Sequence, residues 1–437
     1  MNNMRSSIRY SFLASLLFIS LSSHASLQKE SNVKYYKKFQ EVFERIEKEY
    51  VKEPEKQKLL DAAIEGMVAS LDPHSGYFVD DDLEYFVSNT KGEFGGIGVE
   101  IIYESGAIKV ISPIDDLAAF KAGIKAGDYI VKVNNELISN LGFNKALIEL
   151  RGAPGTKVKV TVIREGETKP LEFELTREIV KIKAVKSSLD NNIGYVRIAT
   201  FSEKAPEELK KEMKNLLEQS KNNLDGLIVD LRNNPGGLLE QGILVADYFM
   251  QKGVIVSTKG RSQNSEIIFS AKDFSEKAPN IPIIVLINGG SASAAEIVAG
   301  ALQESKRALL LGTKSYGKGS VQTFMPIDNR SAFKITTGIY YTPSGKSIQA
   351  EGITPDIIAE QAKVEYPKKD EDQFKFSEAS FKNHIKNEQT KPSEGNNPEE
   401  TPKQKQPVKM SDMYLKDFQY AKAYDLLQGI IILEKRK

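Results

Sequence analysis

Two serines, Ser291 and Ser293, stand close together in the stretch NGGSASAAEIVAG, between an apolar run that predicts a strand and a run that predicts a helix. A serine hydroxyl is a poor nucleophile unless a neighbouring base accepts its proton. The hydrolase pattern G-x-S-x-G is not met around Ser291, because Ser293 occupies the place of the second glycine. Ser293 and Glu296, three residues later, also match a capping box that starts a helix. The pattern therefore indicates a nucleophile or a helix cap.

Histidine, the usual partner of a catalytic serine, is scarce, and cysteine is absent. His24 lies in a stretch near the N-terminus that has the character of an export signal, and His384 lies in a polar tail. A Ser-His-Asp triad would therefore depend on His74 alone, in the stretch LDPHSGYF far upstream of the serines. The same counts argue against a histidine-rich zinc site and exclude a cysteine protease or a thiolate metal site.

Lysine is the remaining candidate for the base. Its amine must be uncharged to accept a proton, which requires burial or a neighbouring positive charge that lowers its pKa. Lys318 lies in a glycine-rich loop between two apolar strand-like runs that could bury its amine. Lys314, four residues earlier, is the alternative base, and either lysine could equally be a solvated surface charge. These residues alone leave the choice open.

The same loop matches most of a phosphate-binding P-loop, with Gly312, Gly317 and Lys318 at the required spacing. The next position needs a serine or threonine to hold magnesium, and here it is Gly319. A P-loop also opens a helix, whereas the following VQTFMPI predicts a strand. An ATPase is therefore disfavoured.

The N-terminus is typical of a secretory signal peptide. Arg5 and Arg9 precede a short apolar run, and residues 23–25 (SHA) resemble a cleavage site. An uncleaved anchor that associates the protein with a membrane is the alternative, although the apolar run is short for a membrane span. Either case predicts a protein outside the cytoplasm, in the periplasm or on the outer face of the inner membrane. A formal net charge of +1 gives no electrostatic footprint for nucleic acid.

Periodicity then predicts the elements that must position these residues. Alternating strands and helices in the second half favour a mostly parallel sheet with both faces covered. The predicted organisation begins with a signal peptide over 1–25, a helical segment over 26–90 that is broken at Pro54, and a β-rich module over 91–178. An α/β unit over 179–361 follows, then a low-complexity disordered linker over 362–410, and finally a C-terminal helix over 411–437 that docks back on the body.

The β-rich module resembles a PDZ domain in two stretches, GEFGGIGVEI and GIKAGDYIVKVNNELI. In such a domain a glycine-rich loop offers backbone N–H groups to the carboxylate of a protein C-terminus, while the peptide adds a strand to the sheet. The resemblance assigns that loop to Gly95, Gly96, Ile97 and Gly98.

Several motifs together resemble one family, the carboxyl-terminal processing proteases, also called tail-specific proteases. The matching stretches are LDPHSGYF, the two PDZ stretches, GYVRIATF, DLRNNPGG, NGGSASAAEIVAGAL, GKGSVQ and TTGIYYTPSGKSIQAEGITPD. They run in order from about residue 35 to 358, which is nearly all of the predicted folded chain.

The resemblance implies roles for individual residues. The nucleophile falls on Ser293, the general base on Lys318, and the glutamine that orients the lysine on Gln322. Ala295 stands where the family often has serine, and we expect no loss of chemistry from it. A helix that begins at Ser293 directs the N–H of Ala294 toward a developing oxyanion.

A second oxyanion donor is expected from NNPGG, at Gly236 or Gly237, where glycine lets backbone approach closely. Arg151, in the loop that closes the PDZ module, is a candidate for a link between that module and the protease body. His74 is interpreted as structural, at the junction between helices and PDZ module.

The resemblance implies a multidomain α/β protein with a helical N-terminal segment, a PDZ domain and a crotonase-like or ClpP-like protease core. The implied activity is that of an exported serine endopeptidase that cuts proteins with apolar, unstructured C-termini. No metal, nucleotide or other cofactor is required. A homo-oligomer stays open, as does a different class of protein, a non-catalytic PDZ scaffold or chaperone.

Overall fold

The computed structural model describes residues 33–363 except 115, 182, 263–264 and 274–275, together with 378, 385 and 411–436. The expected signal peptide and nearly all of the expected linker lie outside these residues. Among the described residues, no helix is long and apolar enough to cross a membrane.

The centre of the molecule is a six-stranded sheet in the order β10-β11-β12-β15-β16-β19. All neighbouring strands in it run parallel except β10, which pairs antiparallel with β11. Its strands are β10 (Val185–Asp190), β11 (Ile193–Ile198), β12 (Gly226–Asp230), β15 (Ile283–Ile287), β16 (Leu309–Gly312) and β19 (Ile357–Ile358). The expected mostly parallel sheet is confirmed.

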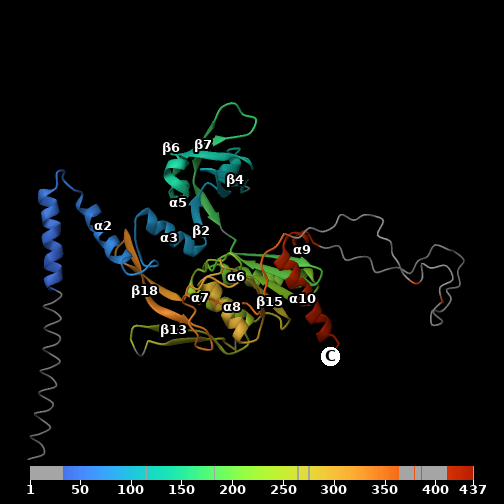
Figure 1. Ribbon diagram of the computed structural model, residues 1–437. Coiled ribbons are helices and arrows are strands. Elements are labelled where there is room, and N and C mark those ends of the chain that lie inside the picture. Colours follow the sequence, from blue (N-terminus) through green and yellow to red (C-terminus); the bar gives the residue numbers. More distant parts are fainter. Residues whose placement is uncertain are drawn as a thin grey trace, which may run out of the picture.

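Both faces of this sheet are covered, because alternate residues of each buried strand point to opposite sides. On one face Val229 and Val285 pack in the core under three helices, α6 (Ala205–Gln219), α7 (Leu239–Phe249) and α8 (Ala294–Glu304). On the other face Ile228 and Ile284 pack against Tyr420, Leu427 and other residues of α10 (Phe418–Glu434). Figure 1 shows α10, in red, beside β15.

The C-terminal stretch contains two helices rather than the single one expected. Helix α9 (Asp412–Lys416) ends at Asp417, which is extended with φ −121° and ψ 103°. The Asp417 side chain accepts a hydrogen bond from the N–H of Tyr420 and so caps the start of α10. The same carboxylate pairs with Arg232 beneath it, which fixes where the break falls.

A second sheet lies beside the first, in the order β1-β18-β13-β14 with β17 also pairing with β18. Its strands are β1 (Gly76–Val79), β13 (Val254–Gly260), β14 (Ile267–Ser270), β17 (Ser320–Pro326) and β18 (Ser331–Tyr341). The sequence pattern does not predict β1, because the turn residues before it dominate the stretch LDPHSGYF. Its partner β18 is more than 250 residues away, and local periodicity carries no record of such a pairing.

The β-rich module forms a separate sheet in the order β3-β4-β5-β7-β8, with β6 also pairing with β5. Its elements are β3 (Val99–Glu104), β4 (Ala107–Pro113), α4 (Ala118–Lys121), β5 (Tyr129–Val133), β6 (Glu136–Leu137), α5 (Ile138–Leu150), β7 (Lys157–Ile163) and β8 (Leu171–Thr176). It has its own apolar core, which includes Ile108, Ile130 and Val160. A two-stranded ribbon, β2 (Glu93–Gly96) with β9 (Glu178–Lys181), joins it to the body, as Figure 1 shows.

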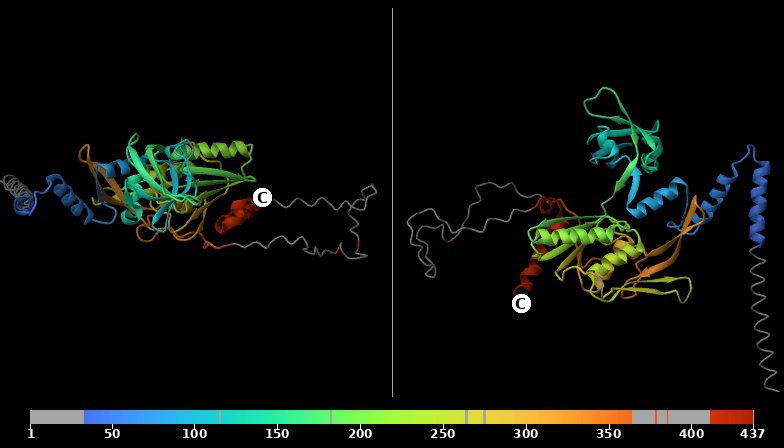
Figure 2. Two further views of the ribbon diagram at one scale, coloured as in Figure 1. Left: turned by 90° about the horizontal axis from the view of Figure 1, so that it is seen from above. Right: turned by 180° about the vertical axis from the view of Figure 1, so that it is seen from behind.

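The N-terminal segment contains helical residues 33–49 and α2 (Lys56–Ala69), separated around Pro54 as expected. Figure 2 shows that both project away from the body. Helix α3 (Asp81–Lys91) follows β1 and lies between the body and the β-rich module. The chain thus passes through the edge of the second sheet before it enters the β-rich module.

Docking of α10 should contribute measurably to stability. Leu427 is fully buried, and Gly226 of β12 leaves the space that its side chain fills. We expect Leu427→Ala to lower the free energy of unfolding by about 3 kcal/mol in urea titrations. Ile432→Ala, at a half-exposed position of the same helix, is the control and should cost far less. Equal losses would contradict the described packing.

Candidate active site

Ser293 lies at the start of α8, immediately after the turn that follows β15. Its backbone has φ 55° and ψ −116°, a strained conformation for a residue other than glycine. Its N–H donates to Glu296 Oε2 at 2.8 Å, and the expected capping box between Ser293 and Glu296 is present. The strained backbone therefore places the Ser293 hydroxyl at the start of α8.

Ser291 has a different role. Its Oγ donates to the carbonyl oxygen of Leu231 at 2.8 Å and accepts from the N–H of Asn288 at 3.0 Å. The residue is fully buried. The bond to Leu231 holds the turn against the loop that follows β12, and the bond from Asn288 closes the turn, so this hydroxyl is committed to structure.

Glu296 is a functional residue whose importance the sequence did not reveal. Its side chain is fully buried and accepts four hydrogen bonds, which no cap alone would require. Oε2 accepts from the N–H of Ser293 and, at 2.9 Å, from that of Lys318. Oε1 accepts from Ser315 Oγ and from the N–H of Gly317, each at 2.6 Å. One carboxylate therefore holds the serine turn and the lysine loop together.

Lys318 lies in the loop between β16 and β17, and its side chain is partly buried. Burial lowers the pKa of its amine, and the nearby Lys334 ammonium lowers it further, while Asp72 and Glu296 oppose the shift. Lys314, the alternative base, is exposed to solvent. Burial and charge therefore favour Lys318 over Lys314 as a proton acceptor.

The loop of Lys318 does not open a helix. Residues 313–319 lead directly into β17. A Cβ at Gly319 would lie 2.4 Å from the backbone nitrogen of Gln349, so the loop lies flat against that segment. The glycines serve close backbone packing.

Gln322 lies on β17, close after the loop of Lys318. Its Nε2 donates to Ser320 Oγ at 2.8 Å and to Thr336 Oγ1 at 3.2 Å. Thr336 is its cross-strand partner on β18. These bonds fix the plane of the amide, and the implied role of Gln322 in orienting Lys318 stays a prediction.

The loop after β12 approaches the serine through Gly236. A Cβ on Gly236, which has φ 98°, would lie 2.8 Å from Ser293 Cβ and 3.1 Å from the nitrogen of Ala294. The N–H of Gly236 donates to Asn234 Oδ1 at 2.8 Å, so it closes its own loop. Of the two expected glycine donors, Gly237 is therefore the better candidate, and Gly236 provides room.

Tyr340 on β18 also belongs to the site, and no local pattern marks it. Burial raises the pKa of Tyr340 to about 12, while a hydrogen bond with Ser293 lowers it slightly. The phenol is therefore protonated and contacts the candidate nucleophile. His74, expected only at a domain junction, also lies near the site, because Lys318 is among the charges that lower its pKa after burial.

The glycine-rich stretch of the β-rich module divides between a strand and a loop. Gly95 and Gly96 belong to β2 and pair with Ile179 and Glu178 of β9, so the expected four-residue loop is shorter than predicted. Ile97 and Gly98 lead from β2 into β3, and Gly98 has φ 75°. Among the residues that the structure describes, β3 pairs with β4 alone, which leaves its other edge open.

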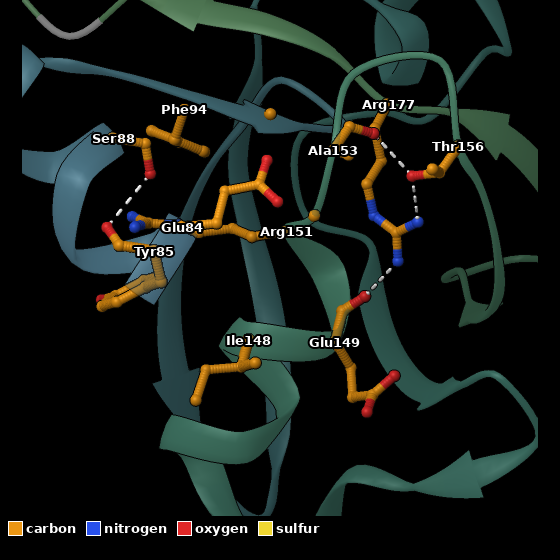
Figure 3. A pocket seen from close by; sticks show the side chains of 12 residues that line it. Glu84, Tyr85, Ser88, Phe94, Ile148, Glu149, Arg151, Ala153, Thr156 and Arg177 are labelled. Atoms are coloured by element: carbon orange, nitrogen blue, oxygen red, sulfur yellow. Dashed lines mark hydrogen bonds between the residues drawn. The ribbon is translucent and has the colours of Figure 1, made fainter. Parts of the chain in front are cut away.

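Arg151 lies beside a pocket of about 270 Å³ between α3 and the β-rich module, shown in Figure 3. Its guanidinium carbon is 3.8 Å from the centroid of the Phe94 ring and 5.0 Å from that of Tyr85. Burial lowers the pKa of Arg151. The structure thus places Arg151 against β2 and α3, and its expected link to the protease core stays a prediction.

Comparison with known proteins agrees with this arrangement. Three family models match the chain: the N-terminal domain of the activating protease CtpB over residues 18–82, a PDZ domain over 95–175, and peptidase family S41 over 192–359. A carboxy-terminal-processing protease of Bartonella bacilliformis is 46% identical over 86% of this chain and 87% of its own. The chain belongs to the carboxy-terminal-processing proteases of family S41. It is a serine-type peptidase with a PDZ domain.

Other members of this protease family are more distant. The carboxy-terminal processing protease CtpA of Bacillus subtilis is 36% identical over 79% of this chain and 73% of its own. A solved structure, the photosystem II D1 C-terminal processing protease, is 28% identical, covers 74% of this chain and 92% of its own, and has a TM-score of 0.46.

The close approach of Gly236 to the nucleophile gives a sharp test in this protease. We expect Gly236→Ala to reduce kcat/KM by more than about 100-fold, because the new methyl would overlap Ser293 and displace it. Gly253→Ala is the matched control, since Gly253 has φ 102° but nothing within 4 Å of an added Cβ. It suffers the same backbone strain without touching the site. Equal activity of the two variants would refute the placement of the loop.

Proposed function

We propose that this protease is an exported endopeptidase that captures apolar, unstructured C-termini with its PDZ domain and cleaves with a Ser293–Lys318 dyad. The observation that carries the dyad is the Glu296 carboxylate, which binds the backbone N–H of both residues. The lowered pKa of Lys318, caused first by burial and then by Lys334, gives that residue the chemistry a base needs.

The proposed cycle has two halves. In the first, the neutral amine of Lys318 takes the proton of Ser293 Oγ as Oγ bonds to the scissile carbonyl carbon. The N–H groups of Ala294 and Gly237 stabilise the oxyanion. Collapse breaks the C–N bond, the Lys318 ammonium protonates the leaving amine, and an acyl-enzyme remains. In the second half Lys318 takes a proton from water as the water oxygen bonds to the ester carbonyl carbon. Collapse then breaks the bond between that carbon and Ser293 Oγ, releases the carboxylic acid, and Lys318 returns the proton to Oγ.

His74 does not meet the requirements for a competing triad. Asp72 Oδ1 accepts from the backbone N–H of His74 at 2.8 Å, so the carboxylate does not orient the imidazole ring through that bond. Burial, followed by the charge of Lys318, lowers the pKa of His74. Its ring is therefore a poorer proton acceptor than an ordinary histidine.

The open edge of β3 supports capture of a C-terminus. A peptide that pairs with β3 would lie between that strand and α5, and its carboxylate would meet the turn at Ile97 and Gly98. Partly buried apolar side chains of both elements pack there, among them Ile101 and Phe143. This lining favours apolar side chains at the end of the substrate.

Export rests on the N-terminal pattern of Arg5, Arg9 and the short apolar run that follows. We propose a periplasmic protein, or one held at the outer face of the inner membrane if the signal is not cleaved. Fractionation of cells that express the full chain should recover it outside the cytoplasm. Recovery in the cytoplasm would contradict export.

The dyad is tested by cleavage of a protein with an unstructured apolar tail. We expect Ser293→Ala and Lys318→Ala to lower kcat by about 1,000-fold or more, since each removes one half of the proton transfer. Lys314→Ala, which removes an exposed lysine from the same loop, should stay within about twofold of the wild type. The His74→Gln variant should also cleave this substrate.

The pH dependence sharpens this test. Activity should rise with pH as Lys318 loses its proton, with a midpoint below the ordinary pKa of lysine. Cleavage that survives Lys318→Ala would exclude the dyad, and a loss in His74→Gln as deep as that in Ser293→Ala would favour a triad. A protein that binds tails but never cuts them would be a scaffold.

Capture by the PDZ domain is tested with matched peptides that end in a carboxylate or in an amide. The amide cannot accept the same N–H bonds, so we expect its KM to rise by about tenfold with kcat little changed. Equal KM values for the two peptides would contradict recognition of a C-terminal carboxylate.

A further inference from the structure

The stretch LDPHSGYF forms a tight turn between α2 and β1. Asp72 Oδ1 accepts from the N–H of His74 at 2.8 Å and of Ser75 at 2.9 Å, and Oδ2 accepts from Ser75 Oγ at 2.8 Å. An aspartate that binds the backbone two and three residues ahead makes the turn stiff. Burial raises the pKa of Asp72, but these hydrogen bonds together lower it below its ordinary value, so the side chain is a carboxylate at neutral pH.

This turn contacts the strand pair that carries Gln322. Strand β1 pairs with β18 from Gly76 opposite Lys334, which brings Ser75 beside Thr336. The N–H of Thr336 donates to Ser75 Oγ at 3.2 Å. Thr336 Oγ1 in turn accepts from Gln322 Nε2 at 3.2 Å. Two hydrogen bonds, both through Thr336, therefore join the N-terminal turn to Gln322.

The same place gathers charged groups from four elements. Asp72 and His74 come from the turn, Lys334 from β18, Lys318 from its loop, and Glu296 from α8. The charges of Asp72, Lys334 and Glu296 influence the pKa of Lys318, and the charge of Lys318 influences the pKa of His74. Lys334 is held by aromatic rings, with its amine 5.5 Å from the centroid of Phe78 and 5.3 Å from that of Phe86. Burial lowers the pKa of Lys334, and Asp72 opposes this shift, while the faces of the two aromatic rings stabilise its cation. Lys334 is thus seated on two rings, and its charge acts on Lys318.

We propose that the Asp72–Ser75 turn is a positioning element of the active site, which holds Gln322 through Thr336, and that Lys334, seated on the rings of Phe78 and Phe86, is a cation that disfavours a second ammonium at Lys318. The turn lies outside residues 192–359, the segment that matches the peptidase model, and inside the match to the N-terminal domain. The catalytic apparatus therefore extends into the N-terminal segment. This inference rests on the proposed role of Lys318 as base.

The positioning part is tested at Ser75. Ser75→Ala removes the hydroxyl that joins Asp72 to Thr336, and we expect kcat to fall about tenfold with KM within about twofold of the wild type. Ser75→Thr retains the hydroxyl and should restore most of the activity. Ser70→Ala is the control, because the Ser70 hydroxyl bonds only to Met67 at the end of α2 and lies outside the network. Thermal unfolding of each variant measures whether the fold is intact.

The electrostatic part is tested by the direction in which the pH profile of kcat/KM moves. Lys334→Met removes a positive charge, so the pKa of Lys318 should rise and the acidic limb should move to higher pH. Lys334→Arg keeps the charge and should leave the limb in place. Asp72→Asn removes a negative charge, so the limb should move to lower pH. Damage to the fold alone would not move the acidic limb to higher pH in Lys334→Met and to lower pH in Asp72→Asn.

Lys318→Ala, measured in parallel, separates this inference from the function on which it rests. If Lys318→Ala is inactive while Ser75→Ala behaves as Ser70→Ala, the positioning role is wrong and the dyad stands. If Lys334→Met and Asp72→Asn shift the limb in the same direction, or leave it unmoved, the electrostatic role is wrong. If Lys318→Ala cleaves normally, the dyad fails, and the inference fails with it.

Discussion

The active site depends on one buried anion, the carboxylate of Glu296. It lies at the positive end of α8, where backbone N–H groups and the helix dipole favour negative charge. Four donors surround it, two of them from the backbones of Ser293 and Lys318. A buried carboxylate is costly unless its lone pairs are satisfied, so the lysine loop must fold against α8 for the charge to be tolerated. The approach of the Lys318 loop to Ser293 therefore follows from the need to satisfy this carboxylate.

The parallel sheet brings the parts of the site to one edge. Strands β12, β15 and β16 are neighbours and run in the same direction, so their carboxyl ends lie together. The loop with the proposed oxyanion donor follows β12, the proposed nucleophile follows β15, and the loop of Lys318 follows β16. Ligands and reaction centres of open α/β sheets are commonly found at this edge.

The C-terminal helix and the N-terminal turn support this edge from outside the peptidase segment. Arg232, at the start of the loop that follows β12, donates to Asp230 and, at 2.7 Å, to Asp417 ahead of α10. Burial opposes the charge of Arg232, yet its two carboxylate partners raise its pKa, so it stays charged. The docked helix α10 therefore holds the base of the loop that contacts Ser293.

Much of the candidate site and of the central sheet could be predicted from the sequence, because both depend on residue types and their local spacing. The scarcity of histidine directed attention to lysine, the small residues around Ser293 indicated close backbone approach, and the alternation of strand-like and helix-like runs predicted the central sheet. The choice between the two lysines needed the structure, in which Lys318 is partly buried and Lys314 is exposed, so Lys318 is favoured as the base.

The parts that could not be predicted depend on contacts between distant segments. Glu296 has the spacing of a cap, and nothing local indicates that its carboxylate also binds a loop about twenty residues later. Ser75 contacts Thr336 across 261 positions, through a strand pairing that periodicity does not encode. The division of the glycine-rich stretch between a strand and a loop also depends on a distant contact, because Gly95 pairs with β9 far along the chain.

The central claim, that Glu296 holds Ser293 and Lys318 in one reactive arrangement, is tested most directly by the rate at which a small serine-directed electrophile labels Ser293. Mass spectrometry of the wild type and Glu296→Gln, with unfolding measured alongside, gives that rate for each. Glutamine has the same shape, but its NH₂ group would face backbone donors. We predict labelling at Ser293 in the folded wild type and a rate at least about tenfold lower in folded Glu296→Gln. Equal rates in the two folded proteins would contradict the claim.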